Sequence, residues 1–65
     1  MKSISVVTAC FNEEENVEEL YRRVRDQFQA LGRYRYEHIF IDNASTDRTV
    51  AVLKRLAAAD RNVKI

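Results

Sequence analysis

Two short runs of apolar, mostly β-branched residues, separated by a longer amphipathic stretch, limit the folds open to this chain. Residues 4–10 read ISVVTAC and residues 38–42 read HIFID. Short, largely apolar runs are typical of strands buried on both faces of a parallel sheet. A third apolar run, residues 63–65, follows a second amphipathic stretch. The sequence therefore predicts three strands separated by two helices.

The stretch between the first two runs has the pattern of a helix. Asn12 is the predicted N-cap, and Glu15 three residues later approximates a capping box. Gly32 follows the last apolar position, where a glycine commonly ends a helix. Residues 33–37 then form a predicted connecting turn. The apolar stripe of this helix is predicted to consist of Val17, Leu20, Tyr21, Val24, Phe28 and Leu31.

A second helix is predicted after the second run. Ser45 or Thr46 is expected to cap it, and Asp47 is expected in its first turn, where the helix dipole favours negative charge. The helix is expected to end near Asp60. Its apolar stripe is predicted to consist of Val50, Leu53, Leu56 and Ala57.

The predicted order of elements is β-α-β-α-β. Crossovers of helix length imply parallel strands with right-handed connections, as in the first half of a doubly wound α/β fold. A chain of 65 residues buries only about 60% of the surface that its unfolded form exposes. Because the third run has no helix after it, we expect a truncated fold, a fragment of a longer protein. Pairing with a second copy, as a homo-oligomer, is one way to cover its apolar surface.

The single cysteine and the balanced charge exclude several classes of protein. Cys10 has no partner for an internal disulfide, and it lies in an apolar run, so we predict a buried thiol. With 11 Lys and Arg against 10 Asp and Glu, the chain lacks the basic excess of a nucleic-acid binder. No apolar run approaches the roughly 20 residues that span a bilayer, so we expect a cytoplasmic location. His38 starts its predicted strand, away from the polar end, and is predicted to be a structural or surface imidazole.

Polar residues gather directly after the first two predicted strands. Ligands of open parallel sheets bind outside the carboxyl ends of the strands. There a carboxylate can accept from a base, an aromatic ring can pack on a base or ribose, and helix N-termini offer N–H groups to phosphate. The same residue types also occur in any β-to-α turn, and Gly32 is the only glycine, so no phosphate-binding glycine motif exists. The residues are Thr8, Ala9, Cys10, Phe11, Asn12 and Glu13 after the first strand, and Asp42, Asn43, Ala44 and Ser45 after the second.

Two segments resemble the start of glycosyltransferase family 2. They read SVVTACFNEEENVEEL (residues 5–20) and YEHIFIDNASTDRT (residues 36–49). The resemblance implies a Rossmann-like GT-A fold that moves a sugar from a nucleotide-sugar to an acceptor with inversion. The Asn-Glu-Glu-Glu-Asn-Val stretch looks most like the branch of dolichol-phosphate mannose synthase and the polyprenyl-phosphate glucosyltransferases. The expected fold is therefore the β-α-β-α-β parallel-sheet half of that nucleotide-sugar-binding fold.

The resemblance also implies roles for single residues. Asp42 and Phe11 would hold the base, with Glu13 supporting the loop. Ser45 and Asp47 fall on positions that look structural, shaping the turn and capping the helix. The full set of implied nucleotide-sugar-binding residues is Ala9, Phe11, Glu13, Asp42 and Asn43.

The chain departs from the family pattern at four of its motif positions. Ala9 replaces the usual proline, Phe11 replaces a tyrosine, Asn43 replaces a second aspartate and Ala44 replaces a glycine. Phe11 can still pack on a ring, and Asn43 keeps an acceptor oxygen but adds a donor. These changes resemble those of a subfamily.

Two parts of the family's catalytic machinery have no counterpart in these residues. The family holds Mg²⁺ or Mn²⁺ with an Asp-x-Asp motif, and a later carboxylate deprotonates the acceptor. Neither the motif nor that base occurs in the sequence. We expect no catalytic residue, no metal ligand and no transferase activity in this chain alone. The complete enzyme would use a UDP- or GDP-sugar and a lipid-phosphate acceptor, such as a polyprenyl phosphate, at the cytoplasmic face of a membrane.

Two other functions stay open at this point. A flavodoxin-like receiver domain has the same order of elements but needs an acidic pair ending its first strand, where this chain has Phe11, Asn12 and Glu13. A non-catalytic module that associates through its sheet edge is also compatible with the pattern.

Overall fold

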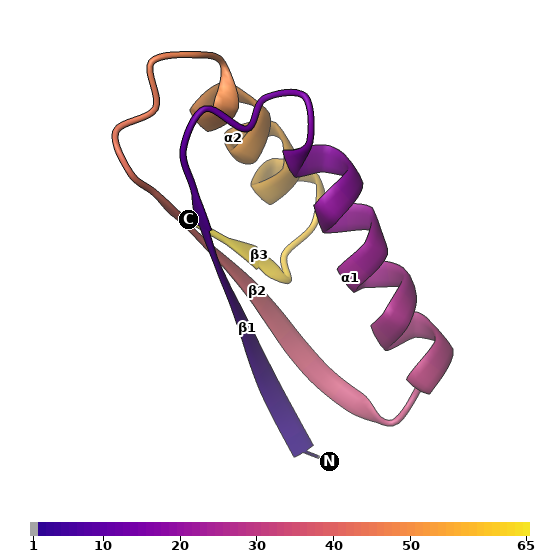
Figure 1. Cartoon of the computed structure of the whole chain (residues 1–65). Coiled ribbons are helices and arrows are strands. Elements are labelled where there is room, and N and C mark those ends of the chain that lie inside the picture. Colours follow the sequence, from indigo (N-terminus) through magenta and orange to yellow (C-terminus); the bar gives the residue numbers. More distant parts are fainter. Residues whose placement is uncertain (1) are drawn as a thin grey trace.

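The computed structural model describes residues 2–65, which form a three-stranded parallel sheet with both helices on one face (Figure 1). The elements are β1 (Lys2–Cys10), α1 (Val17–Leu31), β2 (Tyr34–Asp42), α2 (Thr49–Ala59) and β3 (Val63–Lys64). The strand order is β1-β2-β3, so β2 is central and pairs in parallel with both neighbours. The predicted α/β class and the β-α-β-α-β order are confirmed.

The first two strands are longer than predicted. They pair residue by residue from Lys2 opposite Tyr34 to the end of both strands. The prediction of a turn at residues 33–37 is therefore wrong, because β2 already begins at Tyr34. Successive side chains of β2 point to opposite faces of the sheet. Tyr36 stacks on Phe28 of α1 with ring centroids 4.4 Å apart.

The core lies between β2 and the two helices. Phe40 of β2 and Leu53 of α2 are fully buried at its centre. The stripe of α1 is narrower than predicted, because Leu20 and Leu31 are 38% and 52% exposed. Leu20 lies over the edge of β1 that pairs with no strand among residues 2–65. The buried apolar cluster consists of Cys10, Val17, Tyr21, Phe40, Leu53, Leu56 and Val63.

The first helix begins four residues later than the sequence predicts. Asn12 is not its N-cap, because that residue lies in the left-handed region with φ of 51°. The carbonyl of Glu13 instead accepts the N–H groups of Asn16 and Val17, both at 2.9 Å, and the helix starts at Val17. The predicted capping box between Asn12 and Glu15 is wrong for the same reason. Gly32 ends the helix as predicted, with φ of 66° and its N–H on a carbonyl of the last turn.

The second helix begins at Thr49, and neither Ser45 nor Thr46 caps it. Asp47 takes that role from outside the helix, because its Oδ1 accepts the Thr49 N–H at 2.9 Å. The helix ends at Ala59, next to the predicted end. Within residues 2–65, neither helix is long and apolar enough to cross a membrane.

One face of the sheet has no helix over it. Val7 and Ile41 lie on this face and are 59% and 49% exposed, whereas Phe40, next to Ile41, points into the core. The accessible area of the structure is 4711 Å², whereas a monomer of this mass exposes about 4,300 Å² on average. The described residues thus leave this apolar sheet face uncovered.

Candidate functional site

The ends of β1 and β2 are neighbours, as a shared crevice requires. Cys10 pairs with Asp42 at the last position of both strands, and the Asn43 N–H donates to the Cys10 carbonyl at 2.8 Å. Two loops therefore leave the same edge of the sheet, which Figure 1 shows at its upper end. We call residues 11–16 the first loop and residues 43–48 the second loop. The predicted site residues Ala9, Phe11, Glu13, Asp42 and Asn43 lie in or beside these loops.

Side chains from the second loop and from the start of α2 hold the backbone of the first loop. Three consecutive N–H groups of the first loop donate to them, two of them to hydroxyls and one to a carboxylate. The pairs are Asn12 to Ser45 Oγ at 3.0 Å, Glu13 to Thr49 Oγ1 at 2.8 Å, and Glu14 to Asp47 Oδ2 at 3.3 Å. We call this set of three hydrogen bonds the cross-loop clamp.

The side chain of Asn12, in the first loop, accepts a hydrogen bond from the backbone of the second loop. Its Oδ1 accepts the Thr46 N–H at 2.8 Å. A residue with φ of 51° is strained unless it is Gly, Asn or Asp, and Asn is among the side chains that tolerate it. Asn12 therefore ties the two loops together and does not cap its own helix.

The polar residues after β2 thus serve the neighbouring loop as well as their own helix. This changes one expectation, because the N–H groups of residues 12–14 and of Thr49 already have acceptors inside the protein. They do not offer themselves to phosphate oxygens in this arrangement. Residues 12–14 precede α1, which begins at Val17, so the expectation that helix N-termini offer N–H groups to phosphate stays a prediction for the remaining N–H groups in the first turns of α1 and α2.

Asp42 shapes the turn that follows β2. Its Oδ2 accepts the Ser45 N–H at 3.0 Å, and its Oδ1 accepts the Ser45 hydroxyl. A carboxylate has about four acceptor positions, so these two contacts leave others available. Ala44 lies inside this turn with φ of 57°. A residue with a Cβ pays about 1–2 kcal/mol there, which is a strain that the family's usual glycine avoids.

Asp47 carries a charge that its hydrogen bonds stabilise. Partial burial acts to raise its pKa, but the Thr49 hydroxyl, the Thr49 N–H and the Glu14 N–H together outweigh that effect and hold the pKa below its usual value. The Thr49 hydroxyl lies 2.5 Å from Asp47 Oδ1. A charged acceptor strengthens each of these hydrogen bonds.

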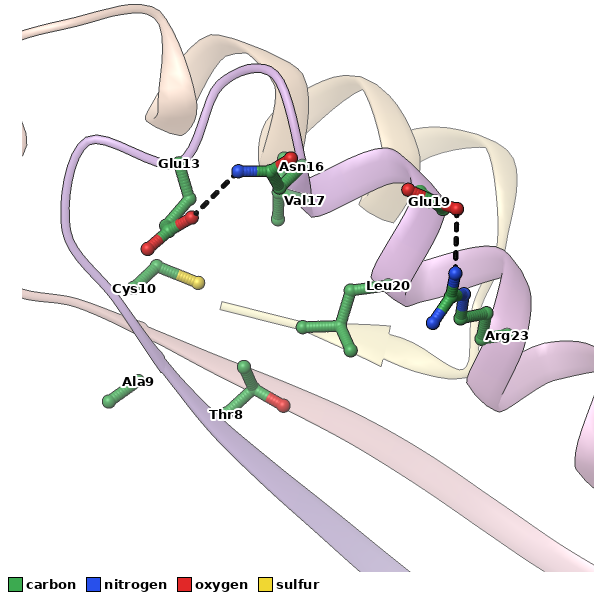
Figure 2. Close-up of a pocket in the computed structure, with 9 residues that line it drawn as sticks. All are labelled: Thr8, Ala9, Cys10, Glu13, Asn16, Val17, Glu19, Leu20 and Arg23. Atoms are coloured by element: carbon green, nitrogen blue, oxygen red, sulfur yellow. Dashed lines mark hydrogen bonds and ion pairs between the residues drawn. The ribbon is translucent and has the colours of Figure 1, made fainter.

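A hollow of about 300 Å³ lies between the unpaired edge of β1 and the first turns of α1 (Figure 2). Ala9, Cys10 and Glu13 line it on the side of β1 and the first loop, and Leu20 lines it on the helix side. Figure 2 shows the Glu13 carboxylate turned toward Asn16, whose Nδ2 donates to it at 3.3 Å. The hollow is therefore continuous with the first loop, while Phe11 and the residues after β2 lie outside its lining.

Cys10 is the buried thiol that the sequence predicts, with 3% of its surface exposed. Burial raises its pKa, and the negative charges of Glu13 and Asp42 raise it further. The thiol therefore stays protonated at neutral pH. Glu13 lines the same hollow as Cys10, and Asp42 pairs with Cys10 at the end of the two strands, so two carboxylate residues lie near this thiol.

His38 lies in the core and away from the loops, as predicted for a structural imidazole. It is 1% exposed, its Nε2 lies 2.9 Å from Thr8 Oγ1, and its ring stacks on Phe40. Burial lowers its pKa. His38 takes no part in the candidate site.

Sequence reasoning missed Thr49, which is fully buried and joins both loops. The sequence contains a signal for Thr49, because polar residues stand at every second position, as Ser45, Asp47 and Thr49. The three side chains of the cross-loop clamp come from these three positions. That they contact another loop depends on the pairing of β1 with β2 and is invisible in the local pattern.

Among the described residues 2–65, no group of three or more His, Cys, Asp or Glu side chains could hold a metal ion. These residues therefore do not fit the Mg²⁺ or Mn²⁺ that the resemblance implies.

Comparison with known proteins gives a consistent picture. A family model described as glycosyl transferase family 2 matches residues 5–65. The bactoprenol glucosyl transferase of Shigella phage SfV is 42% identical over 57 residues, which are 88% of this chain and 18% of that protein. The prophage bactoprenol glucosyl transferase homolog of Escherichia coli K12 is 40% identical over the same length and coverage. The chain spans less than a fifth of the length of these curated relatives.

Proposed function

This chain belongs to glycosyltransferase family 2, and we propose that its two strand-end loops form the base-recognising part of a sugar-nucleotide site. The observation that carries the proposal is the adjacency of the β1 and β2 ends, with Cys10 opposite Asp42. This adjacency brings the exposed ring of Phe11 and the carboxylate of Asp42, which has free acceptor positions, to the same end of the sheet. Family membership also rejects the receiver-domain alternative.

Asp42 is the proposed acceptor for the base. Uracil and guanine both present N–H donors on their pairing edges, and a carboxylate is acceptor-only when ionised. Ser45 fixes the orientation of Asp42 through two hydrogen bonds. Asn43 is exposed beside it and offers both a donor and an acceptor, which suits a base edge that carries both.

Phe11 is the proposed stacking platform. Its side chain is 55% exposed directly after β1, where an aromatic ring would otherwise be expected in the core. Stacking of a base on an aromatic side chain contributes about 1–3 kcal/mol. Ala9 and Glu13 stand two residues before and two residues after Phe11, and both border the hollow beside the first loop.

The charge of this region favours the base end of the ligand over its diphosphate. Glu13 and Asp42 are close enough to raise the pKa of the same thiol, and the N–H groups of residues 12–14 already have acceptors. Carboxylates repel phosphate groups and attract N–H donors. In the complete enzyme we propose that Mg²⁺ or Mn²⁺, which neutralises the diphosphate, is held by residues outside this chain.

For the whole protein we propose transfer of a sugar from a UDP- or GDP-sugar to a polyprenyl phosphate, with inversion, at the cytoplasmic face of a membrane. The support is the similarity to bactoprenol glucosyl transferases. The catalytic base would also come from outside these residues. We therefore expect no sugar transfer by this chain alone.

Calorimetric titration of the chain with UDP and with GDP, each with Mg²⁺, tests the proposal. We expect saturable binding of one nucleotide and at least about tenfold weaker binding by Asp42→Ala, because an ionic hydrogen bond is worth about 1.5–3 kcal/mol. Asp26→Ala is the matched control, since Asp26 is an exposed aspartate on α1 that pairs only with Arg25. Equal affinities of Asp42→Ala and the wild type would remove Asp42 from the site.

The uncovered sheet face favours a second candidate, a self-associating module. Val7, Ile41 and Phe11 are all about half exposed or more, and a second copy could cover them. Association of copies remains a prediction. Sedimentation of the chain over a range of concentrations tests it, and a monomer at every concentration would reject it.

A further inference from the structure

We propose that Thr49 and Asp47 are positioning residues that hold the first loop in the conformation that presents Phe11 and Glu13 to the nucleotide. This inference rests on the proposed function, because it gives these two residues a role in the same site. Neither residue touches the proposed ligand. They act through the cross-loop clamp.

Thr49 connects the two loops through a single hydroxyl. Its Oγ1 accepts the Glu13 N–H at 2.8 Å and donates to Asp47 Oδ1 at 2.5 Å. The side chain is fully buried, so water does not replace either partner. Because a hydroxyl has one hydrogen to donate, the bond to Asp47 fixes the direction in which the oxygen faces Glu13.

Asp47 anchors the clamp to the start of α2. Its Oδ1 also accepts the Thr49 N–H at 2.9 Å, and its Oδ2 accepts the Glu14 N–H at 3.3 Å. One carboxylate thus serves a helix end and the neighbouring loop together. Its hydrogen bonds are charge-assisted and belong to the stronger class. The position of Glu13 and Glu14 therefore follows that of α2.

The first loop depends on hydrogen bonds because core packing does little to hold its first two residues. Asn12 occupies the left-handed region, and the Phe11 ring is more exposed than buried, so core packing does not fix either residue. The three clamped N–H groups follow Phe11 directly along the chain. A loop that is already ordered in its binding conformation avoids an entropic cost when the ligand binds. Losing the clamp should weaken binding without removing any ligand contact.

The two halves of the proposed site are coupled by the same contacts. Asp42 starts the second loop and is oriented by Ser45, and the Ser45 hydroxyl also accepts the Asn12 N–H at 3.0 Å. The acceptor for the base and the ring that stacks on it therefore keep a constant relative position only while the loops stay joined.

The test compares Thr49→Val with Thr49→Ser in titrations of the full chain with UDP and GDP in the presence of Mg²⁺. Valine keeps the shape of threonine but has no hydroxyl, whereas serine keeps the hydroxyl. We expect about tenfold weaker nucleotide binding for Thr49→Val and at most about a twofold change for Thr49→Ser. Thr46→Val is the comparison variant, because Thr46 is exposed and joins the first loop mainly through its backbone N–H at 2.8 Å, with a longer hydroxyl contact of 3.4 Å to the same Asn12 oxygen.

Hydrogen exchange of the Glu13 amide, followed by NMR without nucleotide, is the second readout. We expect faster exchange in Thr49→Val than in the wild type, and wild-type exchange in Thr49→Ser. A change in overall stability alone would speed exchange throughout the core, for example at Phe40 and Leu53, and not only in the first loop. If circular dichroism shows that Thr49→Val is unfolded, Asp47→Asn takes its place, since an amide keeps one acceptor oxygen where the carboxylate uses two.

Each outcome decides the question. Weaker binding together with faster Glu13 exchange in Thr49→Val, both restored in Thr49→Ser, supports the positioning role. Wild-type affinity in a folded Thr49→Val overturns it and leaves the proposed function standing. Failure of the wild-type chain to bind either nucleotide counts against the proposed function itself, and the positioning role falls with it.

Discussion

Acidification should destabilise this protein through its only histidine. His38 is buried at the centre of the sheet, with one hydrogen bond to Thr8 and no partner for Nδ1 among the described residues. Burial lowers its pKa in the folded state from the ordinary value of 6.5. The unfolded chain therefore binds a proton that the folded protein resists. Stability is fully present above pH 6.5 and is lost as the pH falls from there toward the folded-state pKa.

The size of the loss has an upper limit. If His38 stays neutral in the folded state, the unfolded state gains RT ln(1 + 10^(pKa − pH)), which amounts to about 2 kcal/mol between about pH 7.5 and about pH 5. The loss of stability would be smaller if a second folded conformer exposed Nδ1 to water and allowed it to bind a proton. Most domains have a free energy of unfolding of about 5–15 kcal/mol, and a domain as small as this one has less. A loss of about 2 kcal/mol is therefore a large fraction of the total.

Urea denaturation followed by circular dichroism at both pH values measures this loss. His38→Leu removes the titrating group and is the comparison variant, and Thr8→Val added to it avoids leaving the threonine hydroxyl without its partner. We expect the wild type to lose up to about 2 kcal/mol more than the variants. The same loss in wild type and variants would refute the reasoning, because the change would then come from the carboxylates.

Two further predictions concern the core. Leu53→Ala should cost about 2–5 kcal/mol of stability, because Leu53 is fully buried. Leu31→Ala should cost less than about 1 kcal/mol, because Leu31 is 52% exposed. Thermal denaturation measures both, and equal shifts would show that the core is placed wrongly. The thiol of Cys10 should react with iodoacetamide much more slowly in the folded protein than in urea, because it is buried and its pKa is raised; equal rates under both conditions would mean that the end of β1 is open to solvent.

Much of the architecture was predictable because it depends on local patterns. The apolar runs and amphipathic stretches predicted three parallel strands and two helices, and Gly32 ends α1 where the sequence places it. Periodicity of apolar residues reports which face of an element is buried, and a glycine after the last apolar position reports a left-handed residue. The two strand-end motifs also predicted family membership, which the match over residues 5–65 confirms.

The boundaries of elements failed where polar residues had a distant partner. Asn12 has the composition of an N-cap, but its amide oxygen accepts from Thr46, thirty-four positions away. The segment 33–37 has the composition of a turn, but Tyr36 packs on Phe28 and extends the strand. Local preference is a weak prior that tertiary contacts override.

The order of elements, the family and the residue types at the two strand ends can all be read from local patterns along the chain. What those residue types do depends on the contacts that the fold creates. Ser45, Asp47 and Thr49 look like ordinary turn and cap residues, and their contacts with residues 12–14 arise because β1 and β2 pair in register and bring the two loops together. A hydrogen bond depends on the positions of both partners to within a few tenths of an ångström, and the pattern of one segment carries no information about the position of the other.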